Sequence, residues 1–344
     1  MTLTATRPAV VAPHRVRAAA IDAERFTMTM RLDLRHAGPR DVTIRAESLG
    51  PVDAPTIFVA GGISAHRHVA ASTSYPGIGW WEALAGPHRA LDPTRHRLVA
   101  IDWLGIDGDL DAPIDSADQA AASVAALDHL GIQRAQAYVG ASYGGMVGLQ
   151  LAATFPERLE RLVVISAAHR PHPYSSAWRG VQRRILELGR ASGAETEALS
   201  LARQLAMLSY RTPAEFADRF TNPPVVEDSR VECPADGYLQ ACGARFAATF
   251  NPTAWLRLSE SIDLHRVDPT AVTVPTTAIA VAEDRLVPSA DIAELVAWLG
   301  GAGELQVIRS TYGHDAFLKE PEAIGRLVRR ALRSVEGGIA GGAA

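Results

Sequence analysis

Residues 135–146 read AQAYVGASYGGM, an apolar run followed by the pattern G-x-S-x-G at positions 140–144. The run has the composition of a buried strand, and a helical pattern follows the second glycine. Strand, sharp turn and helix form the context in which G-x-S-x-G presents a nucleophilic serine. The glycines two positions before and after the serine leave room for the strand and the helix to pack. We therefore predict that Ser142 is a nucleophile, held in a strained conformation at a helix N-terminus where amide dipoles favour a developing negative charge.

Strand-like and helix-like segments alternate on both sides of this turn. Short apolar runs with strand composition occur at 56–60, 98–102, 135–139, 162–166, 276–281 and 305–308. Helical patterns occur at 116–130, 146–155, 289–299 and 321–335. Runs that are apolar on every side favour a parallel sheet buried on both faces. Together with the serine turn they predict an α/β-hydrolase fold, a mostly parallel central sheet flanked by helices. An amphipathic strand at 26–34, paired with 42–46, is expected to precede it.

Residues 170–273 interrupt the alternation, because they contain no convincing buried strand. Helical patterns at 177–190, 195–208, 213–220 and 254–261 are separated by a proline-containing loop. An insertion of this length between two core strands is expected to form a helical cap over the strand ends, where ligands of open α/β sheets bind. The predicted organisation is a flexible arm at 1–22, a core at 23–169 and 274–335, a cap at 170–273, and a disordered tail at 336–344.

Composition excludes several classes of function. The formal net charge is −4, with Lys+Arg 34 against Asp+Glu 38, which gives no footprint for nucleic acid or an anionic membrane. Cys233 and Cys242 are too few for a disulfide framework and are not spaced as metal ligands, so no metal site is expected. The apolar run at 9–12 is too short for a signal-peptide core, and no stretch approaches a membrane span. We expect a cytoplasmic protein.

A nucleophilic serine needs a base and an acid, which follow it in the chain order serine, acid, histidine in this fold. His314 is the last histidine and lies between the final strand and the final helix, so we predict that it is the base. Asp284 follows the penultimate strand in an acid-x-apolar-x-Pro loop and is the predicted acid, with Glu283 as the alternative. The acid orients the histidine and stabilises its cationic form.

Two backbone amides are expected to form the oxyanion hole. One belongs to Tyr143, the residue after the nucleophile, and the other to the loop after an early strand, where we predict Ile63. His66 and Arg67 lie beside this loop, and Arg170 follows a core strand near the expected site. Pattern alone does not separate a role in binding a carboxylate from an ordinary surface position for these three residues.

Several segments resemble the homoserine O-acyltransferases, a family within the α/β-hydrolase superfamily. The resemblance covers residues from about 50 to 333. The turn at 140–146 is similar to the family's Gly-Gly-Ser-Met-Gly-Gly-Met, and the segment 313–318, GHDAFL, is similar to a family signature. Segments 210–213, 219–220, 238–239 and 251–263 resemble cap motifs of the family.

The resemblance implies roles for three further residues. Arg211 would bind the carboxylate of L-homoserine, a task suited to its forked guanidinium. Asp315 would hold the amino group of homoserine, and Tyr238 would line the pocket. Acyl-CoA, as a co-substrate and not a resident cofactor, would acylate Ser142, and the homoserine hydroxyl would then accept the acyl group.

The chain departs from the family pattern around the expected acyl pocket. GGIS at 61–64 replaces the usual His-Ala-Leu-Thr, 103–108 lack the usual glycine-rich turn, and position 143 is tyrosine. The chain looks most like the branch described as using succinyl-CoA, so succinyl is favoured over acetyl. A succinyl carboxylate would need a cation, for which His66, Arg67 and Arg170 are the candidates.

Other functions remain to be separated from this one. The same three catalytic residues would serve an ester or thioester hydrolase, and L-serine would be a close rival as acceptor. A ligand receptor on this fold would not require Ser142. We also expect a homodimer, because helical caps in this fold often mediate pairing.

Overall fold

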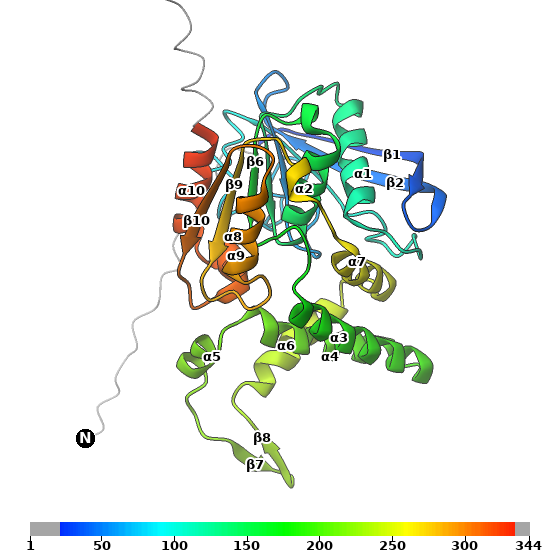
Figure 1. The fold of residues 1–344 in the computed structure, drawn as a ribbon. Helices are drawn as coiled ribbons and strands as arrows, with labels where there is room; N and C mark the ends of the chain where they lie inside the picture. Colours follow the sequence, from blue (N-terminus) through cyan, green and yellow to red (C-terminus); the bar gives the residue numbers. More distant parts are fainter. Residues whose placement is uncertain (1–20, 334–344) are drawn as a thin grey trace, which may run out of the picture.

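The computed structural model of the protein describes residues 21–333 and is built around one eight-stranded sheet (Figure 1). The expected tail, and all but the last two residues of the expected arm, lie outside the described residues. The strand order is β1-β2-β4-β3-β5-β6-β9-β10. The strands are β1 (Ala23–Leu34), β2 (Gly38–Leu49), β3 (Thr56–Ala60), β4 (Arg97–Ile101), β5 (Ala137–Ala141), β6 (Leu162–Ile165), β9 (Thr276–Val281) and β10 (Gly303–Ile308).

The sheet is parallel from β4 to β10, as the apolar runs predict. The hairpin of β1 and β2 joins the β4 edge in the antiparallel sense. Strands β3, β4, β5, β6 and β9 are buried at every position, because each lies between neighbours and under helices or loops on both faces. The edge strand β10 is only partly buried.

The two faces of the sheet carry separate hydrophobic clusters. Phe58 of β3 packs on the face covered by α1 (Ser116–His129) and α2 (Tyr143–Thr154). Ile57 and Val59 point to the other face, which α10 (Pro321–Arg333) and the loop around Trp81 cover. The remaining core helices are α8 (Ser289–Trp298) and α9 (Ala316–Lys319), with 3-10 turns η1 (Pro156–Arg158), η2 (Pro269–Ala271) and η3 (Gly313–Asp315). The expected doubly wound α/β architecture is confirmed.

The turn between β5 and α2 is tighter than the sequence predicts. The strand was expected at 135–139 and the helix from 146, whereas β5 continues to Ala141 and α2 begins at Tyr143. Gly140 pairs with Ala60 of β3, and Ala141 pairs with Ile165 of β6, so the ladder extends to the residue before the serine. A single residue, Ser142, therefore connects strand and helix.

The chain between β6 and β9 forms five helices that lie together beyond one end of the sheet (Figure 1). They are α3 (Pro173–Ser192), α4 (Glu195–Tyr210), α5 (Pro213–Arg219), α6 (Asp236–Ala247) and α7 (Pro252–Leu264). A short exposed hairpin, β7 (Val225–Glu227) and β8 (Arg230–Glu232), projects away from the sheet (Figure 1). We call residues 170–273 the cap.

The helix α6 was not expected, because Gly237 and Gly243 lower the helix propensity of its segment. Gly243 has a packing reason: a Cβ there would lie 2.5 Å from the carbonyl oxygen of Ser200 in α4. The absence of a side chain at Gly243 weakens the helical pattern in the sequence, and it also lets α6 and α4 approach each other closely.

Candidate active site

Ser142 occupies a strained turn at the start of α2. Its backbone has φ 53° and ψ −121°, a conformation that side-chain-bearing residues rarely adopt. A Cβ at Gly144 would lie 2.5 Å from backbone atoms of Ala60, and one at Gly140 would lie 2.4 Å from the carbonyl oxygen of Gly144. The two glycines of the motif are therefore needed for packing, as predicted.

The structure brings Ser142, His314 and Asp284 into one hydrogen-bonded chain. The Oγ of Ser142 lies 2.8 Å from Nε2 of His314, and Nδ1 of His314 lies 2.7 Å from Oδ2 of Asp284. The other oxygen of Asp284 accepts from the amides of Leu286 at 2.8 Å and Val287 at 3.0 Å. The Asp284 side chain is 0% exposed, so its charge acts on the imidazole without screening by water.

Burial and Asp284 act in opposite directions on the pKa of His314. Burial by itself would lower the pKa of His314, because a charged imidazole is costly away from water. The charge and hydrogen bond of Asp284 outweigh burial and raise the pKa above 6.5. Because Nδ1–H donates to the carboxylate, Nε2 is left to accept the proton of Ser142. The arrangement suits a general base acting on a serine hydroxyl.

Glu283, the alternative acid, lies beside a different part of the chain. Its carboxylate accepts from the amide of Ser310 at 2.8 Å and from Nε of Arg309 at 2.9 Å. Asp284, and not Glu283, is therefore the carboxylate that contacts His314.

Tyr143 and Ile63 both line the cavity that contains Ser142. The amide of Tyr143 is at the first position of α2, where a backbone N–H has no acceptor within the helix. The loop that carries Ile63 is tied to the turn, because the amide of Gly144 donates to Gly61 O at 2.7 Å. The indole of Trp103 donates to Gly62 O at 3.0 Å from the other side.

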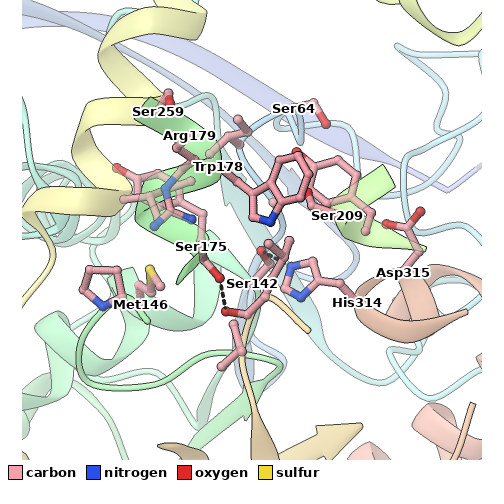
Figure 2. A pocket seen from close by; sticks show the side chains of 18 of the residues that line it. Ser64, Ser142, Met146, Ser175, Trp178, Arg179, Ser209, Ser259, His314 and Asp315 are labelled. Atoms are coloured by element: carbon pink, nitrogen blue, oxygen red, sulfur yellow. Dashed lines mark hydrogen bonds between the residues drawn. The ribbon is translucent and has the colours of Figure 1, made fainter. Parts of the chain in front are cut away.

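The cavity over Ser142 has a volume of about 180 Å³ and lies between the core and the cap. Figure 2 shows Ser142 and His314 facing Trp178 and Arg179 of α3. The residues of α3 that line it are Ser175, Trp178, Arg179 and Gln182. Their spacing of i, i+3, i+4 and i+7 places them on one helix face. Sequence reasoning missed this face, although the spacing was visible, because the helix was expected to begin only at 177.

Arg179 brings a positive charge to the cavity wall. Asp263 of α7 accepts from Nε of Arg179 at 2.9 Å and from Nη1 of Arg183 at 2.7 Å. Burial would raise the pKa of Asp263, but the charge of Arg179 and hydrogen bonds with the two arginines lower it, so this carboxylate stays ionised. One carboxylate shared by two guanidinium groups leaves this cluster net positive.

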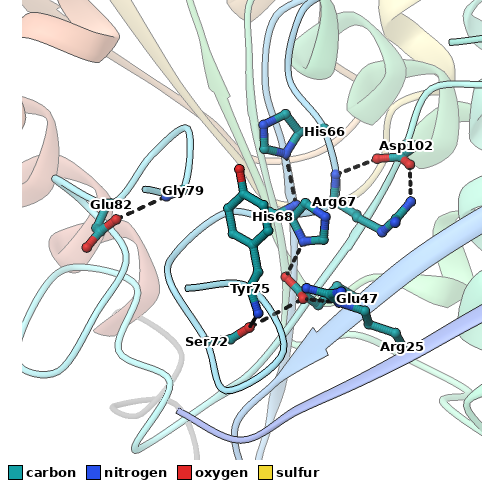
Figure 3. A network of polar contacts seen from close by, with 10 residues as sticks. All are labelled: Arg25, Glu47, His66, Arg67, His68, Ser72, Tyr75, Gly79, Glu82 and Asp102. Carbon is teal, nitrogen blue, oxygen red and sulfur yellow. Dashed lines mark hydrogen bonds and ion pairs between the residues drawn. The ribbon is translucent and has the colours of Figure 1, made fainter. Parts of the chain in front are cut away.

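Of the three predicted acyl-carboxylate candidates, the structure places only Arg170 in the cavity lining. Its Nη2 donates to Glu294 at 2.6 Å. His66 and Arg67 point elsewhere, because the chain turns directly after Ile63, where Ala65 N donates to Gly62 O. The amide and guanidinium of Arg67 both bind Asp102 (Figure 3).

A buried polar network supports the loop at 61–80 from beneath (Figure 3). Glu47 of β2, with its side chain 0% exposed, accepts from Nε of Arg25 at 2.8 Å and contacts Nδ1 of His68 at 3.0 Å. The ring of His68 stacks on Tyr75, with centroids 4.0 Å apart. The network joins the β1–β2 hairpin to the loop that carries Ile63.

Arg211, Asp315 and Tyr238 line a second cavity of about 890 Å³, which adjoins the first. The Nε of Arg211 lies 2.8 Å from Oδ2 of Asp315, and its Nη1 donates to Glu215 at 2.7 Å. Asp315 directly follows His314 and lines both cavities. Tyr238 lies further out, beneath the guanidinium of Arg219, and lines only the second cavity.

Within residues 21–333 no cluster of histidine, cysteine or acidic side chains has the arrangement of a metal site. None of the described helices combines the length and the apolar character needed to cross a membrane.

The chain is similar to known proteins over most of its length. The alpha/beta hydrolase fold family matches residues 55–321. A homoserine O-succinyltransferase of Xanthomonas campestris pv. campestris is 55% identical over 312 residues, which cover 91% of this chain and 85% of the relative. A homoserine O-acetyltransferase of Thermus thermophilus is 30% identical over 277 residues, which cover 72% of this chain and 70% of the relative.

Solved structures share the fold. A homoserine O-acetyltransferase from Bacillus anthracis has a TM-score of 0.82 at 16% identity, covering 90% of this chain and 98% of its own. Esterase E22 has a TM-score of 0.81 at 18% identity, covering 90% of this chain and 100% of its own. A transferase and an esterase thus share this architecture, so the fold does not separate transfer from hydrolysis.

Proposed function

The chain belongs to the α/β-hydrolase fold family and, within it, to the homoserine O-acyltransferases, and from this premise we propose that it transfers a succinyl group from succinyl-CoA to the hydroxyl of L-homoserine. The observation that carries the proposal is the hydrogen-bonded chain of Ser142, His314 and Asp284, which opens into a cavity with a net positive wall. The identity of 55% to a homoserine O-succinyltransferase supports the same donor and acceptor.

In the first half-reaction, Nε2 of His314 accepts the Ser142 proton as Oγ attacks the thioester carbonyl carbon. The amides of Tyr143 and Ile63 stabilise the negative charge that develops on the carbonyl oxygen. When the tetrahedral intermediate collapses, the carbon–sulfur bond breaks and His314 gives its proton to the departing thiolate. CoA leaves and Ser142 carries a succinyl ester.

In the second half-reaction, His314 takes the proton of the homoserine hydroxyl, whose oxygen attacks the succinyl ester. The bond to Ser142 breaks, and its Oγ recovers a proton from His314. The side chain of Arg211 binds the homoserine carboxylate and Asp315 its amino group, while Tyr238 closes the outer side of the pocket. The contact of 2.8 Å between Arg211 and Asp315 keeps these opposite charges side by side, which matches the charge pair of an amino acid.

The positive charge of the cavity lining supports a succinyl group and not an acetyl group as the group transferred. A succinyl group ends in a carboxylate, which needs a cation where water is excluded. Arg179 lines the cavity and shares its carboxylate partner with Arg183, so part of its charge is available to a ligand. Arg170 lines the same cavity. An acetyl group would leave this charge without a partner in the ligand.

The test is incubation with succinyl-CoA, with and without L-homoserine. We expect O-succinylhomoserine by mass spectrometry and one CoA released for each ester formed. CoA release at the same rate without homoserine, and no ester, would instead identify a thioester hydrolase. Parallel reactions with acetyl-CoA and with L-serine identify the acyl group and the acceptor, and Ser142→Ala should abolish transfer in every case.

We further propose that the enzyme acts as a cytoplasmic homodimer, needs acyl-CoA only as co-substrate, and works in methionine biosynthesis. The dimer proposal is supported by large apolar side chains exposed on neighbouring cap helices, including Leu188 of α3 and Leu201 and Leu208 of α4. Size-exclusion chromatography with light scattering tests it, since a mass of 36.7 kDa would identify a monomer.

A further inference from the structure

The second cavity is larger than the first and opens directly beside it. Its volume is about 890 Å³, against about 180 Å³ for the cavity over Ser142. Arg203 of α4, together with Asp315 and Leu318, lines both. Small-molecule sites measure roughly 300 to 1,000 Å³, so the inner cavity has room for an acyl group but not for a whole acyl-CoA. Most of the donor must therefore lie outside it.

The lining of the second cavity is positively charged, although the chain as a whole carries −4. Five cationic side chains face three carboxylates: Arg203, Arg211, Arg219, Arg245 and Lys319 against Glu215, Asp218 and Asp315. Two of the carboxylates, Glu215 and Asp315, are bound by Arg211. Arg211 balances one of these two negative charges, and Arg219, whose Nη1 lies 4.0 Å from Glu215, balances the other.

Three of the remaining cations have no acidic partner in the part of the chain that the structure describes. Arg203 lies over the rings of Tyr210 and Phe246, at 5.2 Å and 4.7 Å from their centroids. The guanidinium of Arg245 donates a hydrogen bond to the sulfur of Cys242, at 3.5 Å. Lys319 is the single lysine of the whole chain, and it is exposed at this rim. Cations gathered in a concave surface without counter-charges favour a polyanionic ligand.

We propose that this second cavity binds the diphosphate and 3′-phosphate of acyl-CoA. The inference rests on the proposed function, because it assigns a place to the donor of that reaction. Arg203, Arg245 and Lys319 bind the phosphates, and the pantetheine arm runs inward past Leu318 to bring the thioester to Ser142. Guanidinium groups suit phosphate oxygens because they donate two parallel hydrogen bonds, whereas the lysine acts as a point charge.

This placement also explains why the two substrates react in turn. Arg211 and Asp315, the proposed contacts of homoserine, lie along the route between the phosphates and Ser142. The pantetheine arm and the acceptor cannot occupy that route together. CoA must leave before homoserine binds, so free CoA should compete with homoserine for the acylated enzyme.

The decisive experiment compares two donors that differ only in their phosphates. Initial rates are measured with succinyl-CoA and with succinyl-pantetheine for wild type, Arg245→Gln and Lys319→Gln. We expect each variant to lower kcat/KM for succinyl-CoA by about tenfold or more, mainly through KM, and to leave the rate with succinyl-pantetheine within about twofold of wild type. Equal losses with both donors, or no loss with either, would overturn the proposal.

A matched control is Arg330→Gln, which removes an arginine that is 68% exposed on α10 and paired with Glu304. This variant should leave the rates with succinyl-CoA and with succinyl-pantetheine unchanged. The affinity of Ser142→Ala for CoA should fall as salt is raised, and it should fall less steeply when Arg245 is also replaced.

Direct titration of CoA into the Ser142→Ala protein separates this inference from the proposed function. If O-succinylhomoserine forms but CoA binds the Arg245 and Lys319 variants as tightly as the parent, only the phosphate site is wrong. If CoA binds in an Arg245-dependent manner but no O-succinylhomoserine forms, the acceptor assignment fails and the phosphate site stands. If CoA does not bind at all, both fail.

Discussion

Asp284 has two effects on His314 that can be measured separately. It holds the Nδ1–H tautomer through a hydrogen bond of 2.7 Å, and it raises the pKa of the imidazole against the opposing effect of burial. In Asp284→Asn the amide can donate to Nδ1 and favour the wrong tautomer. We expect kcat to fall by about 10⁴-fold, as for the same change in a serine protease. Stopped-flow measurement of CoA release tests this.

The pH dependence follows from the same residue. His314 must be neutral to accept the Ser142 proton, so activity should fall on the acidic side with a midpoint above 6.5. In Asp284→Asn the carboxylate no longer opposes the effect of burial on the pKa of His314. The acidic midpoint of the pH profile of the residual activity should therefore move to lower pH. Glu283→Gln is the matched control, since that carboxylate binds Arg309 and not His314. An unchanged acidic midpoint in Asp284→Asn would contradict this account.

Arg179 should determine which acyl group is accepted. In Arg179→Gln the succinyl carboxylate loses a charged partner in a site shielded from water, and we expect kcat/KM for succinyl-CoA to fall by about 100-fold. The value for acetyl-CoA should change by only a few-fold, because acetyl carries no carboxylate. Arg183→Gln is the control, because Arg183 binds the same Asp263 but does not line the cavity. Parallel losses with both donors would show that Arg179 acts through folding.

At the scale of single residues, the positions that could be predicted from sequence are those defined by chain order. Ser142, Asp284 and His314 each follow a recognisable strand, and the fold brings the ends of parallel strands together. His66 and Arg67 are near Ile63 in sequence but do not line the cavity. The turn after Ile63 directs Arg67 to Asp102, and the ring of His66 accepts from the amide of His68. Arg179 could not be assigned because it lies in the cap, and only the assembled fold brings α3 to the cavity that contains Ser142.

At the scale of elements, the loop at 61–80 depends on the strands beneath it. Glu47 is buried between Arg25 and His68, and a buried charge that loses its partner costs about 3 kcal/mol or more. Glu47→Gln keeps the shape but removes the charge, so we expect a lower melting temperature. We also expect a lower kcat, because the loop that carries Ile63, whose amide we propose as an oxyanion donor, shifts. The KM for homoserine should stay close to wild type. Thermal unfolding and steady-state kinetics measure both.

The same hairpin offers a control for this substitution. Asp41 pairs with Arg31 at 3.5 Å, but both side chains are more than half exposed, and such pairs contribute little. Asp41→Asn should leave the melting temperature and kcat unchanged. If Glu47→Gln lowered stability without any change in kcat, the network would be structural support only and not a means of positioning the oxyanion loop.

Element boundaries were predictable where side chains mark them. Strands β3 and β9 lie where their apolar runs predict, because a proline precedes each run. The end of β5 was misplaced, because Gly140 and Ala141 have small side chains that carry little pattern. The helix α6 was missed for a related reason, since its Gly243 serves the contact with α4. Backbone contacts decide these cases, and sequence patterns do not record them.

At the scale of the whole molecule, the core and the cap meet through a buried histidine. His265 follows α7, where the chain returns from the cap to the core. Its side chain is fully buried, lies 2.7 Å from the Oγ of Ser116 in α1, and lies 3.1 Å from Ala168 O, just before the cap begins. Since a carbonyl only accepts, Nε2 carries the hydrogen, and in the neutral ring Nδ1 accepts from the Ser116 hydroxyl. The position of such a contact follows only from the assembled fold.

Acidification should weaken this junction. Burial lowers the pKa of His265 to about 4, against 6.5 for an ordinary histidine, and outweighs the hydrogen bond to Ala168 O. Between pH 6.5 and 4 the unfolded chain therefore binds more protons at this site than the folded chain. The free energy of unfolding should fall through that window, by about 3 kcal/mol in all from His265. His314, whose folded pKa is raised, contributes in the opposite sense, because its stabilisation is present at low pH and is lost as pH rises.

Urea unfolding at pH 7 and pH 4.5, followed by tryptophan fluorescence, measures this contribution. The loss of stability on acidification should be smaller in His265→Gln than in wild type, although the variant starts from a lower stability at pH 7 because the packed ring is gone. His129→Gln, which changes an exposed histidine at the end of α1, should keep the pH dependence of wild type. An equal loss in wild type and His265→Gln would place the acid sensitivity elsewhere. The predicted difference arises because the ring joins two segments that only the complete fold brings together.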